Sequence, residues 1–378
     1  MTITPTTAHP TLDPFRLGQL ELTNRLAVAP MTRVSAEPDG TPTAEMAHYY
    51  REFAEGGFGL VIVEGTYTDA THSRGYLCQP KGLVSEAHVA GWRAVVDGVH
   101  RAGVPLIAQL MHAGALSQGN PSGHGTIAPS AVKPLGRMLE EYGGAGSRPT
   151  PREANRADLA ETVAGFVAAA ANARSAGFDG VEIHGANGYL LDQFLTAYTN
   201  RRSDHYGGDV AARIRLTAEV VGAVVADAPS GFVVGVRLSQ TKVNDFVYRW
   251  PGGAGDAETI FVALADAGAG YLHVASEGRD FIETARFADG RTITSVAREV
   301  SGLPVIANGG MHDLGRAVDV LSGGHADLLS LARGAPGNPD LPRRVASGRA
   351  LDEFDHDFIT PAATIGNTRA HRAATVAR

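Results

Sequence analysis

Cysteine is almost absent from this sequence, since Cys78 is the only one in 378 residues. A single thiol cannot form an internal disulfide, and it cannot build a zinc or iron–sulfur site that needs several thiolates. No three histidine or acidic residues show metal-ligand spacing on one element either. We therefore expect a chain with no disulfide framework and no metal centre, in which Cys78 is a small packing residue.

Long apolar runs and charge of one sign are missing as well. No stretch reaches the roughly 20 apolar residues of a membrane-spanning helix, and residues 1–13 lack the basic start and apolar core of a signal peptide. The formal net charge is −7, with no block of basic residues, which gives little support to binding of nucleic acid or an anionic membrane. These absences favour a cytoplasmic protein that acts on a small molecule.

Short apolar, β-branched segments alternate with helical patterns along most of the chain. The segments are continuously apolar and show no period of two, as is typical of buried parallel strands. The predicted strands are residues 25–30, 58–64, 105–111, 179–184, 232–238, 271–275, 304–307 and 327–331. The predicted helices are residues 43–55, 85–102, 155–176, 210–227, 256–267, 292–300, 314–321 and 339–346.

Eight βα units joined by right-handed crossovers predict a (βα)8 barrel, the TIM barrel. An open doubly wound sheet is the alternative, but no GxGxxG motif follows the first strand. We expect one barrel domain over residues 1–360 and a flexible C-terminal tail over residues 361–378. An extended loop over residues 113–150 follows the third strand, and loops of this length are usually lids or disordered excursions.

Polar residues follow seven of the predicted strands, at the end where the active site of such a barrel lies. They are Thr32, Glu64 with Gly65, Gln109 with His112, His184, Arg237, Asn308 with Gly309 and Gly310, and Arg333. One such residue could be an ordinary buried hydrogen-bonding group, but seven at one rim indicate a site. The glycines after strand seven and Ala332–Gly334 after strand eight suit a phosphate, because glycine lets backbone N–H groups approach an anion. The phosphate could belong to a substrate or to a cofactor.

Two motifs after the fourth predicted strand are more specific. Residues 182–195 read EIHGANGYLLDQFL, and residues 200–208 read NRRSDHYGG. In both segments the sequence resembles the Old Yellow Enzyme family, whose members carry EIHxANGYLLxQFL and NxRxDxYGG in this order. The resemblance extends over nearly the whole chain, with further matching segments at residues 29–33, 109–110 with 112–114, 128–131, 236–239 and 338–341.

The resemblance implies that the phosphorylated ligand is FMN and that NADPH or NADH is the reductant. The phosphate would be held by the backbone near Gly309, Gly310 and Ala332 and by the side chain of Arg333. No separate dinucleotide-binding fold is expected, because members of the family bind the nicotinamide over the flavin in the same pocket.

The resemblance also assigns residues to the flavin ring. Gln109 would face its pyrimidine edge, where an amide offers both a donor and an acceptor. Arg237 would lie near N1 and C2=O and stabilise the reduced, anionic flavin. Thr32 would donate a hydrogen bond toward C4=O, while Pro30 and Gly65 would shape the pocket through backbone contacts.

Three further residues would carry the chemistry. His184 and Asn187 would point N–H groups at one substrate carbonyl oxygen and polarise its conjugated C=C bond, so that the β-carbon accepts hydride from the flavin. Tyr189 would donate a proton to the α-carbon, since its ordinary pKa of ~10 keeps it protonated at neutral pH. The implied activity is NAD(P)H-dependent reduction of α,β-unsaturated carbonyl compounds, with nitroalkenes as further candidates.

Some positions depart from the family pattern. Met111 stands where Trp is usual, Ala115 where Arg is frequent, and Ala332 where Gly is usual, which requires a negative φ. Residues 357–360 lack the aromatic pair that often covers one end of the flavin. Two alternatives stay open: an FMN-dependent desaturase or oxidase on the same fold, and a flavin-free barrel lyase or isomerase. The sequence leaves the physiological substrate, the choice of nicotinamide and the assembly open, with a homodimer as one option.

Overall fold

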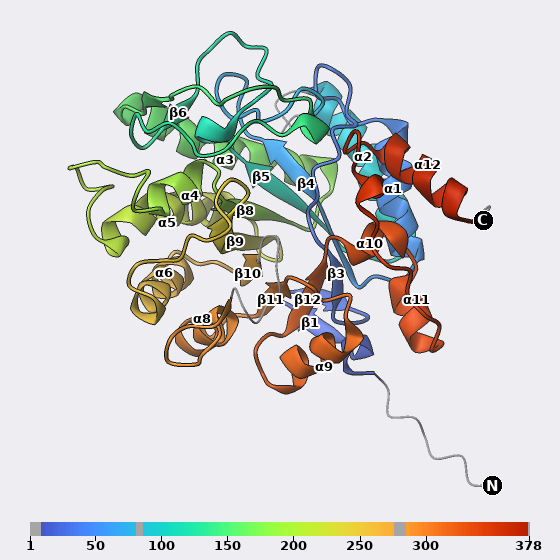
Figure 1. The fold of residues 1–378 in the computed structure, drawn as a ribbon. Coiled ribbons are helices and arrows are strands. Elements are labelled where there is room, and N and C mark those ends of the chain that lie inside the picture. The colour runs from blue at the N-terminus through green and yellow to red at the C-terminus, as the bar shows by residue number, and fades with distance from the viewer. Residues whose placement is uncertain (1–8, 81–85, 276–284, 377–378) are drawn as a thin grey trace, which may run out of the picture.

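Eight parallel strands form a closed barrel in the computed structural model, which describes residues 9–80, 86–275 and 285–376 (Figure 1). Each strand pairs with its neighbour along the chain, and the last pairs with the first to close the ring. The predicted (βα)8 barrel is confirmed, and each predicted strand overlaps an observed one. The strands are β3 (Leu26–Val28), β4 (Leu60–Tyr67), β5 (Leu106–Met111), β8 (Gly180–Asn187), β9 (Val233–Lys242), β10 (Tyr271–Ala275), β11 (Val305–Asn308) and β12 (Leu328–Leu331).

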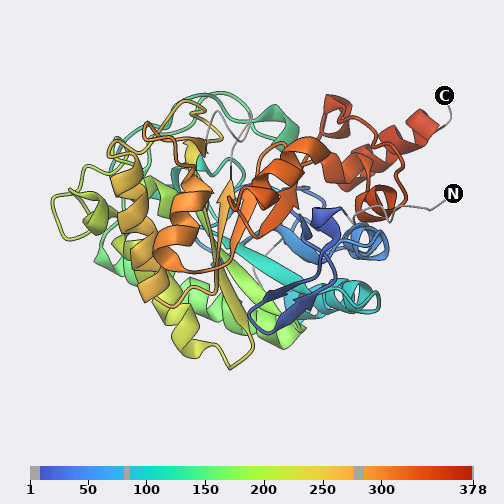
Figure 2. The same ribbon diagram turned by 90° about the horizontal axis from the view of Figure 1, so that it is seen from below.

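Helices surround the barrel, as Figure 2 shows from below. Thr43, Asn155 and Asp209 each accept a hydrogen bond from a backbone N–H of the helix that follows, which satisfies a donor that the helix leaves unpaired. Ser85, the first residue of the second predicted helix, lies outside the described residues. The helices at predicted positions are α1 (Ala44–Glu55), α2 (Glu86–His100), α3 (Arg156–Ala176), α5 (Val210–Asp227), α6 (Ala254–Asp266), α8 (Ile293–Ser301), α9 (Leu314–Ser322) and α11 (Leu341–Ala346).

A hairpin that the sequence pattern did not predict closes the barrel at the amino ends of its strands. It consists of β1 (Phe15–Leu17) and β2 (Leu20–Leu22), which pair in antiparallel fashion. Leu17 and Leu22 are buried in the same apolar cluster as strand residues such as Ile107. Three-residue strands are too short to show a hydrophobic period, although burying their leucines is favourable. Because this end is plugged, a ligand has access from the carboxyl ends of the strands.

The loop over residues 113–150 has structure of its own and lies at the top of the molecule in Figure 1. Its strand β6 (Ile127–Ala128) pairs in parallel with β7 (Arg152–Glu153), just after the loop. The end of the loop therefore returns to β6, in the middle of the loop, before α3 begins. Other short elements of the chain are η1 (Pro10–Leu12), η2 (Gly114–Leu116), η3 (Glu140–Tyr142), α4 (Leu190–Leu195), α10 (Gly334–Gly337), η4 (His356–Phe358) and α12 (Ile365–Val376).

The segment from residue 361 onward, expected as a flexible tail, contains α12, which lies beside α1 in Figure 1. Arg372 on this helix donates to Glu52 on α1 at 3.0 Å. Arg33, which follows the first barrel strand, donates to the buried hydroxyl of Thr368. The helix is attached by these polar contacts and by Ile365, which is fully buried in the apolar core. Contacts between residues so far apart leave no local pattern in the sequence.

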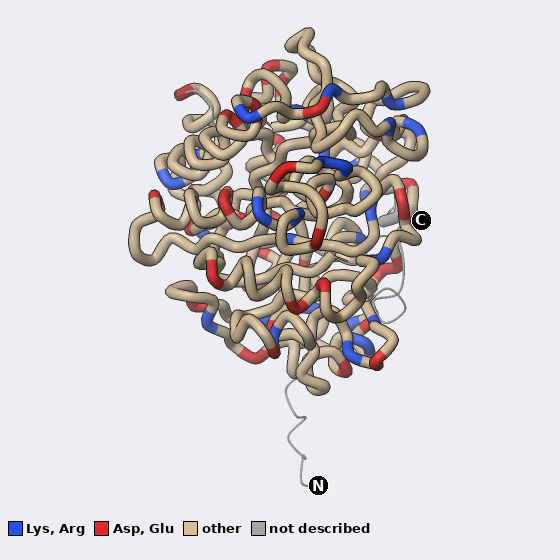
Figure 3. Tube along the Cα trace, turned by 90° about the vertical axis from the view of Figure 1, so that its left-hand side faces the viewer, with Lys and Arg blue, Asp and Glu red and all other residues tan. Residues whose placement is uncertain are grey.

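Charges of both signs are interspersed on the face drawn in Figure 3, where Lys and Arg segments alternate with Asp and Glu segments. Some charged groups form local clusters, as Arg291 does with Glu258 and Asp289, both at 2.8 Å. No helix in the described part of the chain combines the length and the apolar character needed to cross a membrane. The feature that points to a ligand is instead a cavity at the barrel rim.

Gly235 on β9 provides a test of the barrel packing. A Cβ atom at this position would overlap the ring of Tyr271, a fully buried residue of β10. We expect Gly235→Ala to lower the free energy of unfolding by about 1–3 kcal/mol or more, the usual cost of overpacking a core. Urea unfolding monitored by circular dichroism measures this change.

The matched control is Gly222→Ala on α5, where the added Cβ would lie 3.9 Å from the backbone oxygen of Ala267, its nearest neighbour in the described part of the chain. It should raise the free energy of unfolding by about 0.5–1 kcal/mol, because alanine favours a helix interior. Equal stability of Gly235→Ala and wild type would contradict the packing of Tyr271 against β9.

Candidate active site

A cavity opens at the carboxyl ends of the barrel strands. It encloses about 1290 Å³ of space free of protein atoms, part of it open to solvent, and concave sites of this kind are where small ligands bind. Gly65 is the one predicted site residue that does not line it; a Cβ there would stand 3.2 Å from the Gln109 side chain and 3.0 Å from Met111. The predicted residues that line the cavity are Pro30, Thr32, Gln109, His184, Asn187, Tyr189, Arg237, Gly309, Gly310, Ala332 and Arg333.

Gln109 is oriented by a buried network inside the barrel. Its Nε2 donates to Glu182 at 2.8 Å, and the second Glu182 oxygen accepts from Tyr271 at 3.0 Å and from His273 at 2.8 Å. Burial raises the pKa of Glu182, but His273 and Arg237 outweigh burial and lower it to about 2. Because the charged carboxylate takes one amide N–H, Gln109 keeps its carbonyl oxygen and its other N–H for a ligand.

Arg237 brings a buried positive charge to the cavity wall. Its side chain donates to Asn308 at 3.3 Å, and its Nε has no hydrogen-bond partner among the described residues. A buried cation with incomplete hydrogen bonding is unfavourable unless a ligand completes it. An electron-rich or anionic ring edge, such as that of a reduced flavin, meets this requirement.

Two glycines after β11 form a cradle at another part of the cavity. Gly309 and Gly310 have φ values of +126° and +71°, which disfavour any other residue. A side chain on Gly310 would also overlap the guanidinium of Arg316. Burial together with the charges of Arg333 and Arg316 lowers the pKa of His312, which marks a positive potential here. Backbone glycines beside two guanidinium groups suit a phosphate.

His184 and Asn187 lie at the carboxyl end of β8 and both line the cavity. Burial and the charge of Arg237 lower the pKa of His184 to about 3, so its ring is neutral at physiological pH. Neither His184 Nδ1 nor Asn187 Oδ1 has a hydrogen-bond partner within the described ranges. A neutral imidazole has one N–H and an amide has two, so the pair can bind a ligand oxygen.

Asn187 has a left-handed backbone conformation, with φ at +63°. This conformation is uncommon outside glycine, although Asn tolerates it better than most residues. Its N–H donates to the Ser239 hydroxyl at 2.8 Å, and the next N–H, of Gly188, donates to Asp192 at 2.6 Å. Asp192 in turn forms a buried ion pair with Lys242 at 2.6 Å. The turn at the end of β8 is therefore held against β9 by a hydrogen bond to Ser239 and, through Asp192, by the ion pair with Lys242.

Tyr189 follows this turn and begins α4. Its ring lies edge-on to that of His184, with centroids 5.0 Å apart. Its hydroxyl oxygen lies 2.6 Å from the hydroxyl oxygen of Tyr76, so the two phenols share a buried hydrogen bond. The turn thus brings the amide of Asn187 and the phenol hydroxyl of Tyr189 to one cavity.

Several lining residues were not predicted. Tyr76 and Tyr142 come from loops, and their ring centroids are 5.1 Å apart. Phe354 and Ile359 come from the C-terminal segment and supply apolar cover to the cavity, although residues 357–360 lack the aromatic pair of the family. None of these residues follows a barrel strand, so the rule that located the other site residues could not find them.

Two residues of the predicted rim have internal roles in this structure. Glu64 accepts the backbone N–H of Arg33 at 2.8 Å. His112 is buried and accepts the N–H of Gly114 at 3.1 Å, and burial lowers its pKa to about 4. Neither lines the cavity. Ala332 does line it, and it is not among the described non-glycine residues with positive φ, so its backbone tolerates a side chain.

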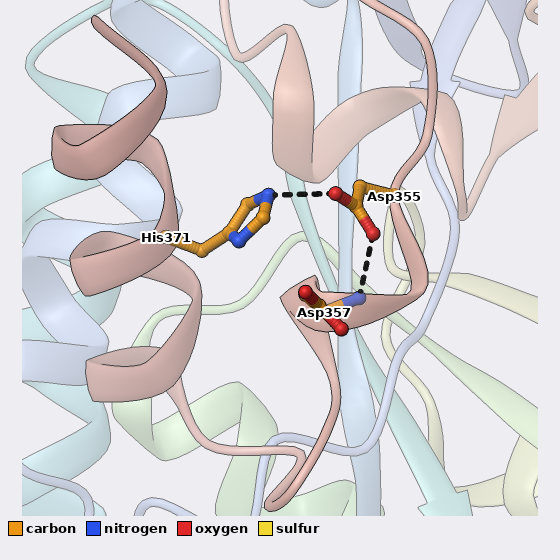
Figure 4. Close-up of side chains that lie close together, drawn as sticks. All are labelled: Asp355, Asp357 and His371. Atoms are coloured by element: carbon orange, nitrogen blue, oxygen red, sulfur yellow. Dashed lines mark hydrogen bonds and ion pairs between the residues drawn. The ribbon is translucent and has the colours of Figure 1, made fainter. Parts of the chain in front are cut away.

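Three potential metal ligands gather away from the cavity, on the C-terminal segment (Figure 4). His371 on α12 lies 3.3 Å from Asp355, and Asp355 also accepts the N–H of Asp357 at 3.0 Å. The aspartates are exposed. Helix capping by Asp355 and a surface ion pair account for this arrangement without a metal ion.

The sequence matches a known protein family over most of its length. The model of the NADH:flavin oxidoreductase / NADH oxidase family matches residues 11–352. 12-Oxophytodienoate reductase 1 of Oryza sativa subsp. japonica is 34% identical over 367 residues, which cover 96% of this chain and 92% of that protein. A match of this length covers the whole barrel and the cavity.

Solved structures of related proteins have the same fold. An Old Yellow Enzyme homologue from Zymomonas mobilis superimposes with a TM-score of 0.84 at 32% identity, covering 95% of this chain and 98% of the other. Morphinone reductase in complex with tetrahydroNAD gives a TM-score of 0.82 at 34% identity, covering 95% and 96%. The chain therefore belongs to the NADH:flavin oxidoreductase / NADH oxidase family, that of Old Yellow Enzyme, and is an FMN-dependent oxidoreductase.

Proposed function

We propose that this enzyme reduces the C=C bond of α,β-unsaturated carbonyl compounds, with His184 and Asn187 binding the carbonyl oxygen and Tyr189 donating a proton. The observation that carries the proposal is the arrangement at the end of β8. There a neutral, buried imidazole, an amide whose oxygen has no partner among the described residues, and a phenol hydroxyl line one cavity. The names of relatives that are reductases of oxophytodienoate and morphinone support the same reaction class.

FMN, when bound, supplies the hydride for the β-carbon and is reduced in turn by NADH or NADPH. The buried cation with an unpaired Nε and the glycine cradle fit this group. The residues proposed to hold FMN are Pro30, Thr32, Gly65, Gln109 and Arg237 around the ring, and Gly309, Gly310, Ala332 and Arg333 around the phosphate.

His184 and Asn187 would act on the substrate oxygen. Their N–H groups would donate hydrogen bonds to this oxygen and stabilise the negative charge that builds on it when the β-carbon gains hydride. In comparable oxyanion sites one such donor contributes about 2.7–4 kcal/mol to lowering the barrier. Because the pKa of His184 is lowered to about 3, its imidazole works as a neutral donor and does not release its proton.

Tyr189 would complete the reaction as a general acid. Its O–H bond breaks as a C–H bond forms at the α-carbon, and the electron pair stays on the phenol oxygen. The enolate oxygen is held by His184 and Asn187 during this step. The substrate leaves with one hydride and one proton added across the former double bond.

Anaerobic half-reactions test this function. The purified protein should show a flavin absorption band, lose it on adding NADH or NADPH, and regain it on mixing with an enone while the saturated ketone forms. Reoxidation by oxygen with no reaction with any enone would contradict the proposal and favour an oxidase. Comparing the two nicotinamides in the first half-reaction determines which one is preferred.

Tyr189→Phe tests the proton donor. The variant keeps the ring, so it should still bind FMN and be reduced by NAD(P)H. Enone reduction should fall by roughly 10²- to 10⁴-fold, the usual contribution of general acid catalysis. Stopped-flow absorbance of the flavin measures both half-reactions.

Nitroalkenes provide the internal control for this variant. Hydride addition to a nitroalkene gives a nitronate, which is stable enough to leave and be protonated in water. Flavin reoxidation by nitroalkenes should therefore survive in Tyr189→Phe. Equal losses with both substrates would mean that Tyr189 only positions ligands, and unchanged enone turnover would mean that another group donates the proton.

Phenol binding tests the His184 and Asn187 pair and its charge state. Two N–H donors favour an ionised oxygen, so phenols should bind the oxidised enzyme as phenolates and produce a long-wavelength charge-transfer band. The folded-state pKa of His184, about 3, lies below its ordinary value, so its ring stays neutral above that pH. Affinity should rise with pH as the phenol ionises and show no added step near ~6.5, the ordinary histidine pKa.

Spectroscopic titrations over a pH series measure this binding. The double variant His184→Ala with Asn187→Ala should lose both the band and most of the affinity. A band that persists in the double variant would rule out the proposed oxygen site. A fall in wild-type affinity as pH rises through ~6.5 would indicate a protonated His184 instead.

A further inference from the structure

A buried arginine of the loop over residues 113–150 lies near the two tyrosines. Arg148 is 2% exposed, and its Nη1 donates to the backbone oxygen of Leu116 at 2.6 Å. Its Nε has no hydrogen-bond partner in the described part of the chain. Burial lowers the pKa of Arg148, and the groups that counteract burial are Tyr76 and Tyr189. Leu116, whose backbone oxygen Arg148 contacts, packs in the same buried cluster as Tyr76 and Tyr189, so the guanidinium lies beside both phenols.

Arg148 differs in this respect from an arginine four residues later. Arg152 is half-exposed and forms an ion pair with Asp158 at 2.7 Å. Among the residues that the structure describes, no carboxylate contributes to the pKa shift of Arg148. A buried cation without an anionic partner is costly. The described groups that act on this pKa and can become anionic are the two phenols.

Tyr76 is the direct hydrogen-bond partner of Tyr189. Their hydroxyl oxygens are 2.6 Å apart, and the two side chains are 3% and 5% exposed. After Tyr189 has given up its proton, its oxygen is an acceptor and the Tyr76 hydroxyl is a donor at hydrogen-bond distance. Hydrogen bonds to a charged oxygen are shorter and about twice as strong as those between neutral groups.

We propose that Tyr76 and Arg148 are positioning residues of the proton-transfer step, which stabilise the phenolate that forms when Tyr189 donates its proton. The proposal rests on the proposed role of Tyr189 as the donor. The O–H bond of Tyr189 breaks, a C–H bond forms at the substrate α-carbon, and the electron pair remains on the phenol oxygen. Tyr76 donates a hydrogen bond to that oxygen, and Arg148 compensates its charge. Both contacts strengthen as charge develops, so they act on the barrier more than on substrate binding.

This assignment gives the loop a function in the reaction. The loop brings Arg148 to the phenols and places Tyr142 against Tyr76. It is held in place by the Gln118 side chain, which donates to the Leu139 backbone oxygen at 2.9 Å and accepts the Leu139 N–H at 3.0 Å. The positive charge of Arg148 thus lies near the hydroxyl group that becomes negative when Tyr189 donates its proton.

Tyr76→Phe and Arg148→Met in the FMN-loaded protein test the proposal. Each variant should slow flavin reoxidation by an enone by roughly 10- to 100-fold, the range expected for losing a hydrogen bond to a charged group. Reoxidation by a nitroalkene, which needs no proton from Tyr189, should be unchanged. Arg148→Lys keeps the charge and should recover part of the loss. Anaerobic stopped-flow absorbance measures the reoxidation rates, and KM for the enone should change less than kcat.

Two controls separate this role from a structural one. Arg137→Met removes an exposed charge from the same loop and should leave the enone rate unchanged. In a Tyr189→Phe background, adding Tyr76→Phe or Arg148→Met should cause no further loss, because the residues act through one hydroxyl. FMN content and the phenol charge-transfer band should be retained in each variant.

Three results would overturn the inference, and they are distinguishable. If Tyr189→Phe slows enones while Tyr76→Phe and Arg148→Met do not, the donor assignment stands and the role of its neighbours is wrong. If the neighbours slow enones and nitroalkenes equally, they only shape the pocket. If Tyr189→Phe itself leaves enone turnover intact, both the proposed donor and the inference that depends on it fail.

Discussion

The parallel pairing of β8 with β9 is the constraint on which the rest of the site depends. In this register His184 lies opposite Arg237, and after a bulge Asn187 lies opposite Lys242. A shift by one residue would turn each side chain to the other face of the sheet. The same pairing brings Ser239 to the Asn187 N–H and Lys242 to Asp192. The left-handed turn, and the tyrosine that follows it, are therefore positioned by the pairing of the two strands and by hydrogen bonds to side chains of Ser239 and Asp192.

Buried polar groups in this barrel are of two kinds. Some orient other side chains, and others keep atoms with which a ligand can form hydrogen bonds. Both oxygens of Glu182 accept hydrogen bonds, from Gln109, Tyr271 and His273, so this carboxylate orients Gln109 without needing a ligand. His184 and Arg237 each keep a buried nitrogen with no partner in the described ranges. Leaving such atoms unsatisfied costs stability, which a bound cofactor or substrate can recover.

The strand-end rule located the predicted cavity residues because parallel strands all end at one rim. It missed Tyr76, whose place beside Tyr189 depends on how a loop folds back over the barrel. It also selected Glu64 and His112, whose side chains accept hydrogen bonds from backbone N–H groups of the protein itself. A strand end tells which rim a residue occupies, whereas the direction of its side chain depends on bulges and on neighbours far away in sequence.

The amino-acid sequence alone was sufficient for the eightfold βα alternation, the order of the strands and the two motifs after the fourth strand, because these features are local or repeat at a regular period. The charge state of His184, the hydrogen bond between Tyr76 and Tyr189 and the burial of Arg148 required the folded chain. Arg148 and Tyr189 are 41 positions apart, and only the folding of the loop brings both to the buried cluster around Leu116. Burial and long-range contacts set the energies of these groups, and neither has a signature in local sequence.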